Sequence, residues 1–78
     1  MISIYGMGTC ALCKKAVELC ERFDLEHEYK DIMVNYQNSV EFTEKFPNAK
    51  IVPQIMWDGQ HFNTFREFEE EVHNTKNV

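Results

Sequence analysis

Two cysteines separated by two residues, Cys10 and Cys13, are the side chains of this sequence best suited to chemistry. They follow a β-prone segment at residues 2–5. Cys10 immediately precedes, and Cys13 lies within, residues 11–23, whose apolar side chains recur at helical spacing. In the first turn of a helix, Cβ atoms three residues apart are roughly 5–6 Å from each other. A small adjustment then brings the two sulfurs to the ~2.05 Å of a disulfide. The pattern predicts a thiol redox site at a strand-to-helix junction.

The two thiols are predicted to have different roles. Cys10 is expected at the N-cap of the helix, where unpaired backbone N–H groups and the helix dipole favour an anion, so it is the expected nucleophile. Cys13, one turn inside and next to the apolar face, is expected to be buried and to act as the resolving thiol. Cys10 would form a mixed disulfide with the substrate, and Cys13 would then attack it, releasing reduced substrate and leaving a Cys10–Cys13 disulfide.

Other interpretations of the cysteines were weighed against this one. Half of a zinc site would need further ligands to reach about four, and the sequence has no second Cys-x-x-Cys and no closely spaced histidine pair. A chance pair of small buried residues is the remaining alternative. The third cysteine, Cys20, lies one heptad after Cys13 on the apolar helix face, which is typical of a small core residue rather than a regulatory thiol.

Composition limits the classes of function. The chain has 78 residues, of which 44% are hydrophobic, and a net charge of −5. This length predicts a single domain, residues 1–78, with no room for a second catalytic module. The acidic balance gives no basis for nucleic-acid binding. Without an apolar run approaching ~18–20 residues or an export signal, we expect a cytoplasmic monomer with no membrane partner; the odd cysteine count fits that compartment.

The first part of the chain has the pattern of a strand, a helix and a second strand. The helix is expected at residues 11–23, and the second strand at residues 26–32, with Tyr29 and Ile32 as its buried side chains. A connection of this length predicts a parallel pair joined by a right-handed crossover.

A second helix and a third strand are expected next. Asn38 and Glu41 have the spacing of a capping box that opens the helix, and Pro47 stops it. The following strand is expected at residues 51–57. Pro53, near its start, is compatible with a trans proline that avoids the ladder at a sheet edge, or with a cis proline that exposes the backbone of Val52 beside the cysteines.

A hairpin and a last helix complete the pattern. Asp58-Gly59 predicts a tight turn into an antiparallel strand at residues 60–62. Thr64 and Glu67 form a second capping box, and the last residues, 74–78, are expected to fray. The order β-α-β-α-β-β-α predicts an α/β fold with a four-stranded mixed sheet flanked by three helices.

Three features at matching separations resemble the glutaredoxin branch of the thioredoxin fold over residues 1–73. They are the Cys10–Cys13 motif after the first strand, Val52-Pro53 entering the third, and Asp58-Gly59 in the hairpin. The resemblance implies that Pro53 is cis and lies against the cysteines. It also implies dithiol–disulfide exchange with glutathione as co-substrate, no tightly bound cofactor or metal, and disulfide-containing protein substrates such as ribonucleotide reductase.

The sequence departs from the glutaredoxin pattern at positions that concern glutathione. Ala11-Leu12 replaces the usual Pro-Tyr between the cysteines, Met7 occupies the usual lysine position, and residues 63–66 replace a Gly-Gly-acidic motif. Losing charged contacts weakens carboxylate binding. The resemblance, together with the residues that stand in place of its usual glutathione contacts, predicts seven residues that contact substrate or glutathione. They are Thr9, Leu12, Lys50, Val52, Pro53, Phe65 and Arg66.

Residues 62–67 are also similar to the Trp-Ser-Gly-Phe-Arg-Pro segment of NrdH-type redoxins, which draw electrons from thioredoxin reductase. The short chain suits the compact glutaredoxins of some large bacteriophages, which would act in the host cytoplasm. Two further hypotheses remain open. One is a thioredoxin-fold binding module whose cysteines are incidental, and the other is a glutathione-ligated iron–sulfur dimer formed through Cys10.

Overall fold

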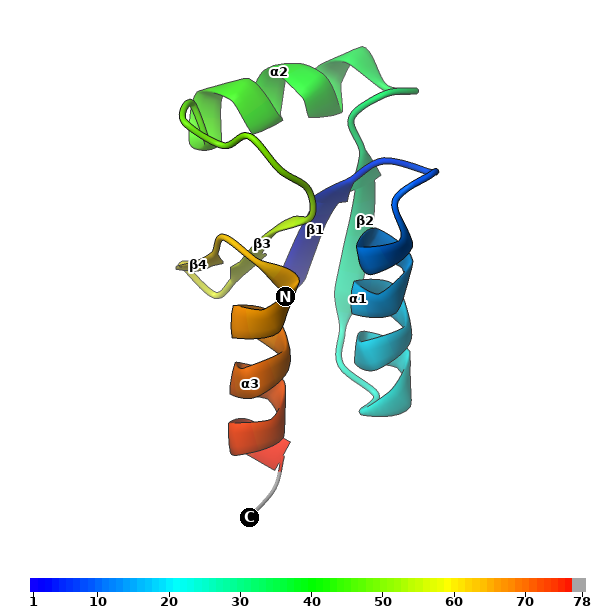
Figure 1. Ribbon diagram of the computed structural model, residues 1–78, viewed down its shortest axis with the longest axis vertical. Helices are drawn as coiled ribbons and strands as arrows, with labels where there is room; N and C mark the ends of the chain where they lie inside the picture. Colours follow the sequence, from blue (N-terminus) through cyan, green and yellow to red (C-terminus); the bar gives the residue numbers. More distant parts are fainter. Residues whose placement is uncertain (77–78) are drawn as a thin grey trace.

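The computed structural model describes residues 1–76 and arranges them around a four-stranded mixed sheet with three helices (Figure 1). The strand order is β2-β1-β3-β4, with β1 parallel to β2 and antiparallel to β3, and β3 antiparallel to β4. This confirms the predicted element order and fold class. The elements are β1 (Ile2–Gly6), α1 (Ala11–Arg22), β2 (His27–Asp31), α2 (Tyr36–Lys45), β3 (Gln54–Trp57), β4 (Gln60–Phe62) and α3 (Phe65–Lys76).

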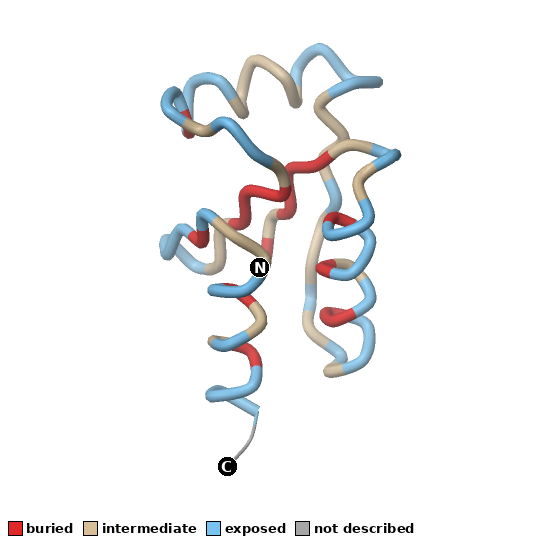
Figure 2. Tube along the Cα trace, in the orientation of Figure 1, coloured by how far each residue is buried: buried red, intermediate tan, exposed pale blue. Residues whose placement is uncertain are grey.

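Side-chain alternation along β1 divides the molecule into two layers. Ile2 and Ile4 point to the face covered by α1 and α3, where they join the main core with Ile55 of β3. Figure 2 shows this core as buried segments along β1 and β3 and along one side of α1 and α3. The predicted inner face of the last helix is confirmed in Phe68 and Val72, which are fully buried. Cys20 is likewise fully buried in this core, as expected.

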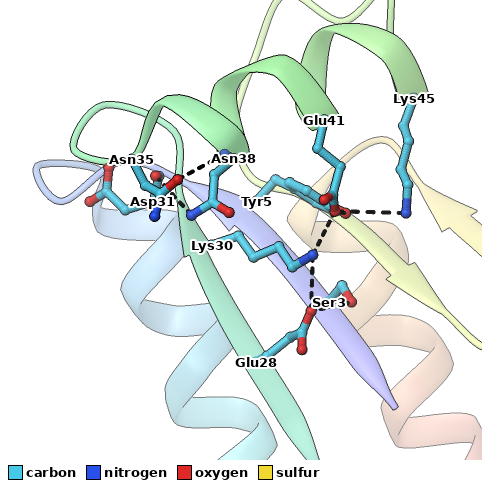
Figure 3. A network of polar contacts seen from close by, with 9 residues as sticks. All are labelled: Ser3, Tyr5, Glu28, Lys30, Asp31, Asn35, Asn38, Glu41 and Lys45. Carbon is cyan, nitrogen blue, oxygen red and sulfur yellow. Dashed lines mark hydrogen bonds and ion pairs between the residues drawn. The ribbon is translucent and has the colours of Figure 1, made fainter.

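The opposite face of the sheet carries α2, which has no fully buried residue of its own. It is held by polar contacts to the outward side chains of β1 and β2 (Figure 3). Tyr5 donates a hydrogen bond to Glu41, and Lys30 forms an ion pair with the same carboxylate. Lys45 lies 3.8 Å from it. The ring of Tyr5 also packs on Phe46, the C-cap of α2, at 5.3 Å between centroids.

The predicted start of the second helix is wrong. The helix begins at Tyr36, because Asn35 takes an extended conformation and its side chain accepts a hydrogen bond from the N–H of Asn38 at 3.1 Å. Asn38 lies inside the helix, where its amide donates to the carbonyl of Asp31 at 3.2 Å. Glu41 is held by Lys30 and Tyr5 instead of completing a capping box.

Two strand predictions also need correction. Tyr29 is 38% exposed and Ile32 lies beyond the strand and is half-buried, because β2 is an edge strand with β1 as its single neighbour in the sheet. The third strand begins at Gln54 rather than at residue 51, and Pro53 immediately before it has no N–H to give to a ladder.

The ends of the helices differ modestly from expectation. The first helix ends at Arg22, with Phe23 as its C-cap. The last helix continues to Lys76, so the fraying expected from residue 74 is wrong for residues 74–76, while residues 77–78 lie outside the described residues. The predicted cap is present, since Thr64 accepts the N–H of Glu67 at 3.2 Å. None of the helices within residues 1–76 is long and apolar enough to cross a membrane.

Candidate active site

Cys10 is the N-cap of α1, as predicted, and its sulfur lies between two backbone groups. The N–H of Cys13 donates to the Cys10 sulfur at 3.2 Å, and the thiol of Cys10 donates to the carbonyl of Val52 at 3.7 Å. The first contact satisfies one of the N–H groups that are left without a partner at the start of the helix. Cys10 is half-buried, whereas Cys13 and Cys20 are buried, so it is the most exposed of the three cysteines.

Cys13 is fully buried one turn further along the helix. Burial, together with its hydrogen bond and charge interaction with Cys10, raises the pKa of the Cys13 thiol to about 12. The backbone of Met7 and the hydroxyl of Tyr29 act in the opposite direction and lower it. Cys13 is therefore a protonated thiol in the reduced protein.

The end of β1 passes directly against Cys13. A Cβ atom placed on Gly6 would lie 2.6 Å from the sulfur of Cys13 and 3.0 Å from the hydroxyl of Tyr29. Both distances are too short for a side chain, so the absence of one at Gly6 allows the helix to approach the strand. This glycine sets the depth at which Cys13 lies.

The Val52–Pro53 peptide bond is cis, and Pro53 is buried. This confirms the expectation from the glutaredoxin resemblance. The conformation aims the carbonyl of Val52 at Cys10. Fully buried Gln54 fixes the adjoining chain, because its amide donates to the carbonyl of Ile51 at 2.9 Å and to that of Asn63 at 3.3 Å.

A surface hollow of about 220 Å³ adjoins this backbone. Its walls come from the loop after β1, the end of β2, the middle of α2 and the segment before Pro53, and they are apolar except for one lysine. The lining residues are Met7, Ile32, Phe42, Ala49, Lys50, Ile51 and Val52. Lys50 thus lies beside the site, as predicted, in an otherwise apolar setting.

The remaining predicted contact residues have varied positions. Thr9 and Leu12 are exposed beside Cys10, with Leu12 44% exposed. Phe65 packs against the core and lines a separate hollow together with Leu19 of α1. Arg66 is ion-paired with Glu70 on its own helix at 3.4 Å. The structure therefore places the carbonyl of Val52 against Cys10 and Lys50 in the same hollow as Val52, whereas Phe65 and Arg66 make other contacts.

Three residues around the site were missed by sequence reasoning, namely Gly6, Tyr29 and Gln54. Gly6 ends a strand two residues after buried Ile4, and the periodicity gives no sign that the helix approaches it. Tyr29 was assigned to the core, but its hydroxyl lies next to Gly6 and Cys13. No group of three or more His, Cys, Asp or Glu side chains among residues 1–76 is arranged to hold a metal ion.

The model of the glutaredoxin family matches residues 2–62 of this chain. No curated protein sequence gives a significant match. Among solved structures, the reduced glutaredoxin of Escherichia coli is 26% identical with a TM-score of 0.69, the match covering 99% of this chain and 98% of that one.

Two further solved structures support the fold. Glutaredoxin 1 of Francisella tularensis, complexed with cacodylate, is 20% identical with a TM-score of 0.75, over 99% of this chain and 96% of that one. The thioredoxin-like protein BC3987 is 16% identical with a TM-score of 0.78, over 92% and 99% of the two chains. With the family match over most of the sequence, this chain belongs to the glutaredoxin family of thiol–disulfide oxidoreductases.

Proposed function

We propose that the protein reduces protein disulfides or glutathione-mixed disulfides, with Cys10 as nucleophile and Cys13 as resolving thiol. The observation that carries this proposal is the convergence of the Cys13 N–H and the Val52 carbonyl on the sulfur of Cys10. One group favours the thiolate that attacks, and the other offers a backbone acceptor next to it. A substrate peptide that lies extended beside Cys10 could bond to that carbonyl.

In the first step the Cys10 thiolate attacks one sulfur of the substrate disulfide. A bond forms between Cys10 and that sulfur, the substrate S–S bond breaks, and the other substrate sulfur leaves as a thiolate. The helix N-terminus stabilises the attacking group, and the half-buried position of Cys10 leaves a path of approach. The protein then carries a mixed disulfide.

In the second step Cys13 loses its proton and attacks Cys10. The Cys10–Cys13 bond forms, and the remaining substrate sulfur leaves as a thiolate, so the substrate gains two electrons and the protein loses two. Two of the causes that raise the pKa of Cys13 are its hydrogen bond and charge interaction with Cys10. Both disappear once Cys10 is in a mixed disulfide, so formation of the intermediate itself prepares Cys13 to react.

The hollow beside Val52 supports a protein as the substrate. An apolar side chain of the substrate, near its reacting cysteine, could bind against the apolar walls formed by Met7, Phe42 and Ile51. Lys50 could pair with a carboxylate of the same substrate. We propose that ribonucleotide reductase is such a substrate. We further propose that the protein acts as a monomer in the cytoplasm, or in the host cytoplasm if a bacteriophage encodes it.

Two electron sources are proposed for recycling the oxidised protein. Glutathione is the source that family membership favours. Thioredoxin reductase, as for NrdH-type redoxins, is the second candidate. The pairing of Arg66 with Glu70 favours it, because that contact occupies a side chain that could otherwise bind a carboxylate of glutathione.

Recycling assays test this proposal. The oxidised protein is given NADPH with either glutathione and glutathione reductase, or thioredoxin reductase alone, and NADPH consumption is measured with a protein disulfide as the final acceptor. Turnover with either source supports the oxidoreductase, and the active source identifies the donor. Cys10→Ser serves as the inactive control, and full turnover by this variant would contradict the proposal.

A further inference from the structure

Cys13 must lose a proton in a place that solvent does not reach. Its side chain is fully buried, and its pKa of about 12 keeps it protonated in the reduced protein. The thiolate is nevertheless the species that attacks a disulfide. A group close to the Cys13 sulfur therefore has to accept this proton as the second step proceeds.

Three polar groups act on the Cys13 thiol, and they differ in what they can do. The backbone contact from Met7 lowers the pKa of Cys13, as a donor to the thiolate does. The sulfur of Cys10 is bonded to the substrate when Cys13 reacts. The hydroxyl of Tyr29 alone among the three can both donate a proton and accept one at that moment.

The position of Tyr29 is suited to this transfer. Its hydroxyl and the sulfur of Cys13 lie 3.0 Å and 2.6 Å from the point at which a Cβ of Gly6 would stand, so both groups border the space that this glycine leaves. The phenol lowers the pKa of the Cys13 thiol, and the thiol raises the pKa of the phenol.

The other side of Tyr29 meets solvent. The residue is 38% exposed and lines a surface hollow of about 400 Å³. The rest of this hollow comes from the loop after β1 and the outer face of α1. The lining residues are Gly8, Lys14, Val17, Glu18 and Tyr29. The hollow described beside Val52 has none of these residues, so Tyr29 opens to solvent separately from that hollow.

We propose, resting on the two-step function above, that the Tyr29 hydroxyl conducts the proton of Cys13 to solvent during the second step. The oxygen of Tyr29 takes the proton from the Cys13 thiol as the Cys10–Cys13 bond forms, and the original hydroxyl proton of Tyr29 passes to water in the outer hollow. The substrate leaves as a thiolate and takes up a proton from solvent. Tyr29 ends the step as a neutral phenol, as it began.

The electrostatic surroundings agree with a relay rather than with a permanent base. Burial, then the charge of Cys13 and that of Asp31, raises the pKa of Tyr29 to about 12. Cys10 acts on it in the same direction, while Lys14 and Glu18 share the outer hollow. A standing phenolate is therefore excluded near neutral pH, so Tyr29 enters the second step as a neutral phenol that can both donate and accept a proton.

Stopped-flow mixing with excess dithiobis-nitrobenzoate tests the relay, because each step releases one coloured thiolate. Tyr29→Phe, which keeps the ring, is expected to leave the first release unchanged and to slow the second by about tenfold or more. The defect should shrink as the pH rises, since hydroxide then competes with the relay. Tyr29→His, which restores a side chain able to accept and donate a proton, should recover part of the second release.

Matched variants separate the relay from the two-step function. Tyr36→Phe removes the hydroxyl of an 80% exposed tyrosine in α2 and should change neither release. Cys13→Ser should give the first release alone; if it gave both at wild-type rates, the two-step function itself would be wrong. If wild type gives both releases and Tyr29→Phe does so at the same rates, or slows both equally, the relay is overturned while the two-step function stands.

Discussion

The backbone N–H of Cys13 lies 3.2 Å from the sulfur of Cys10 and donates a hydrogen bond to it. The two cysteines thus differ, because the amide of Cys13 bonds to the half-buried sulfur of Cys10 while the side chain of Cys13 is buried and stays protonated. The asymmetry exists in the reduced protein before any substrate binds. It depends on the N-cap position of Cys10 and on the burial of Cys13.

The first prediction concerns the division of labour between the cysteines. Cys10→Ser should lose disulfide reduction altogether, because no nucleophile remains at the helix N-terminus. Cys13→Ser should still react once and then stop as a mixed disulfide. Mass spectrometry after exposure to oxidised glutathione would detect this adduct. Cys20→Ala is the control and should keep both steps, and an adduct on Cys20 in the Cys10→Ser variant would contradict the assignment.

The second prediction concerns stability at alkaline pH. Burial, with a smaller effect of Glu21, raises the pKa of Cys20 from 9.0 to about 11. Between these values the unfolded chain loses a proton that the folded chain keeps, so the contribution of Cys20 is complete below about pH 9 and is lost as the pH rises towards 11. The reduced protein should therefore become less stable over this range, and Cys13 adds to the decline.

Urea unfolding of reduced wild type and of Cys20→Ala measures this effect. The variant should be less stable at neutral pH, since it loses buried volume. Its stability should then fall less steeply with pH, so the two curves approach each other in the alkaline range. Parallel curves would show that Cys20 does not contribute to the alkaline loss.

The third prediction tests the close approach of β1 to α1. Gly6→Ala places a methyl group 2.6 Å from the sulfur of Cys13, and overpacking of this kind costs about 1–3 kcal/mol. The midpoint of urea unfolding should fall, and the second step of the reaction should slow because Cys13 is displaced. Gly8→Ala is the matched control. The atom nearest to the added methyl group, an oxygen of Asp31, would lie at 3.5 Å, so stability should change little.

The fourth prediction concerns the attachment of α2. Glu41→Ala removes the carboxylate shared by Tyr5, Lys30 and Lys45, and leaves the buried hydroxyl of Tyr5 without that partner. Amide hydrogen exchange in α2 should become faster, while exchange in α1 and α3 should change less. Glu44→Ala, at an exposed position of the same helix, is the control and should leave exchange unchanged. Equal exchange in both variants would exclude a role for this network in holding α2.

The contribution of Glu41 to stability changes with pH in the opposite direction from that of the buried thiols. Hydrogen bonds from Lys30 and then Tyr5 lower the pKa of Glu41 below 4.5. Its contribution to stability is therefore present above that value and is lost as the pH falls below it. In the wild-type protein, α2 exchange corrected for its intrinsic pH dependence should accelerate on acidification, and in Glu41→Ala this acceleration should be reduced.

Periodicity and turn chemistry are local properties, and they were sufficient for the order of the elements. Asp58 and Gly59 show why, since both take left-handed φ values, 48° and 89°, that the dipeptide itself favours. The start of α2 was harder to place. Asn35 and Asn38 both suit an N-cap, and the choice between them depends on contacts of Asn38 and Glu41 with β1 and β2, which the spacing of the capping residues does not reveal.

The site, like the fold, could be predicted from the sequence only in part. Cys10, Cys13 and the Val52–Pro53 pair follow from a motif and a family resemblance, and the structure places them in contact. Tyr29 could not be assigned because an aromatic residue in a strand most often belongs to a core. Its actual position follows from β2 being an edge strand and from the space left by Gly6, which are properties of the assembled sheet.

The helix α2 supplies Phe42 to the hollow beside Val52, yet no residue within this helix is fully buried. The polar contacts of Glu41 therefore hold this wall of the hollow together with the packing of Phe42 and Phe46 on the ring of Tyr5. Dissolved salt weakens partly exposed ion pairs and leaves apolar packing intact. The shape of this hollow is consequently adjustable by ionic strength, so preference among protein disulfides should change with salt while the chemistry at Cys10 does not.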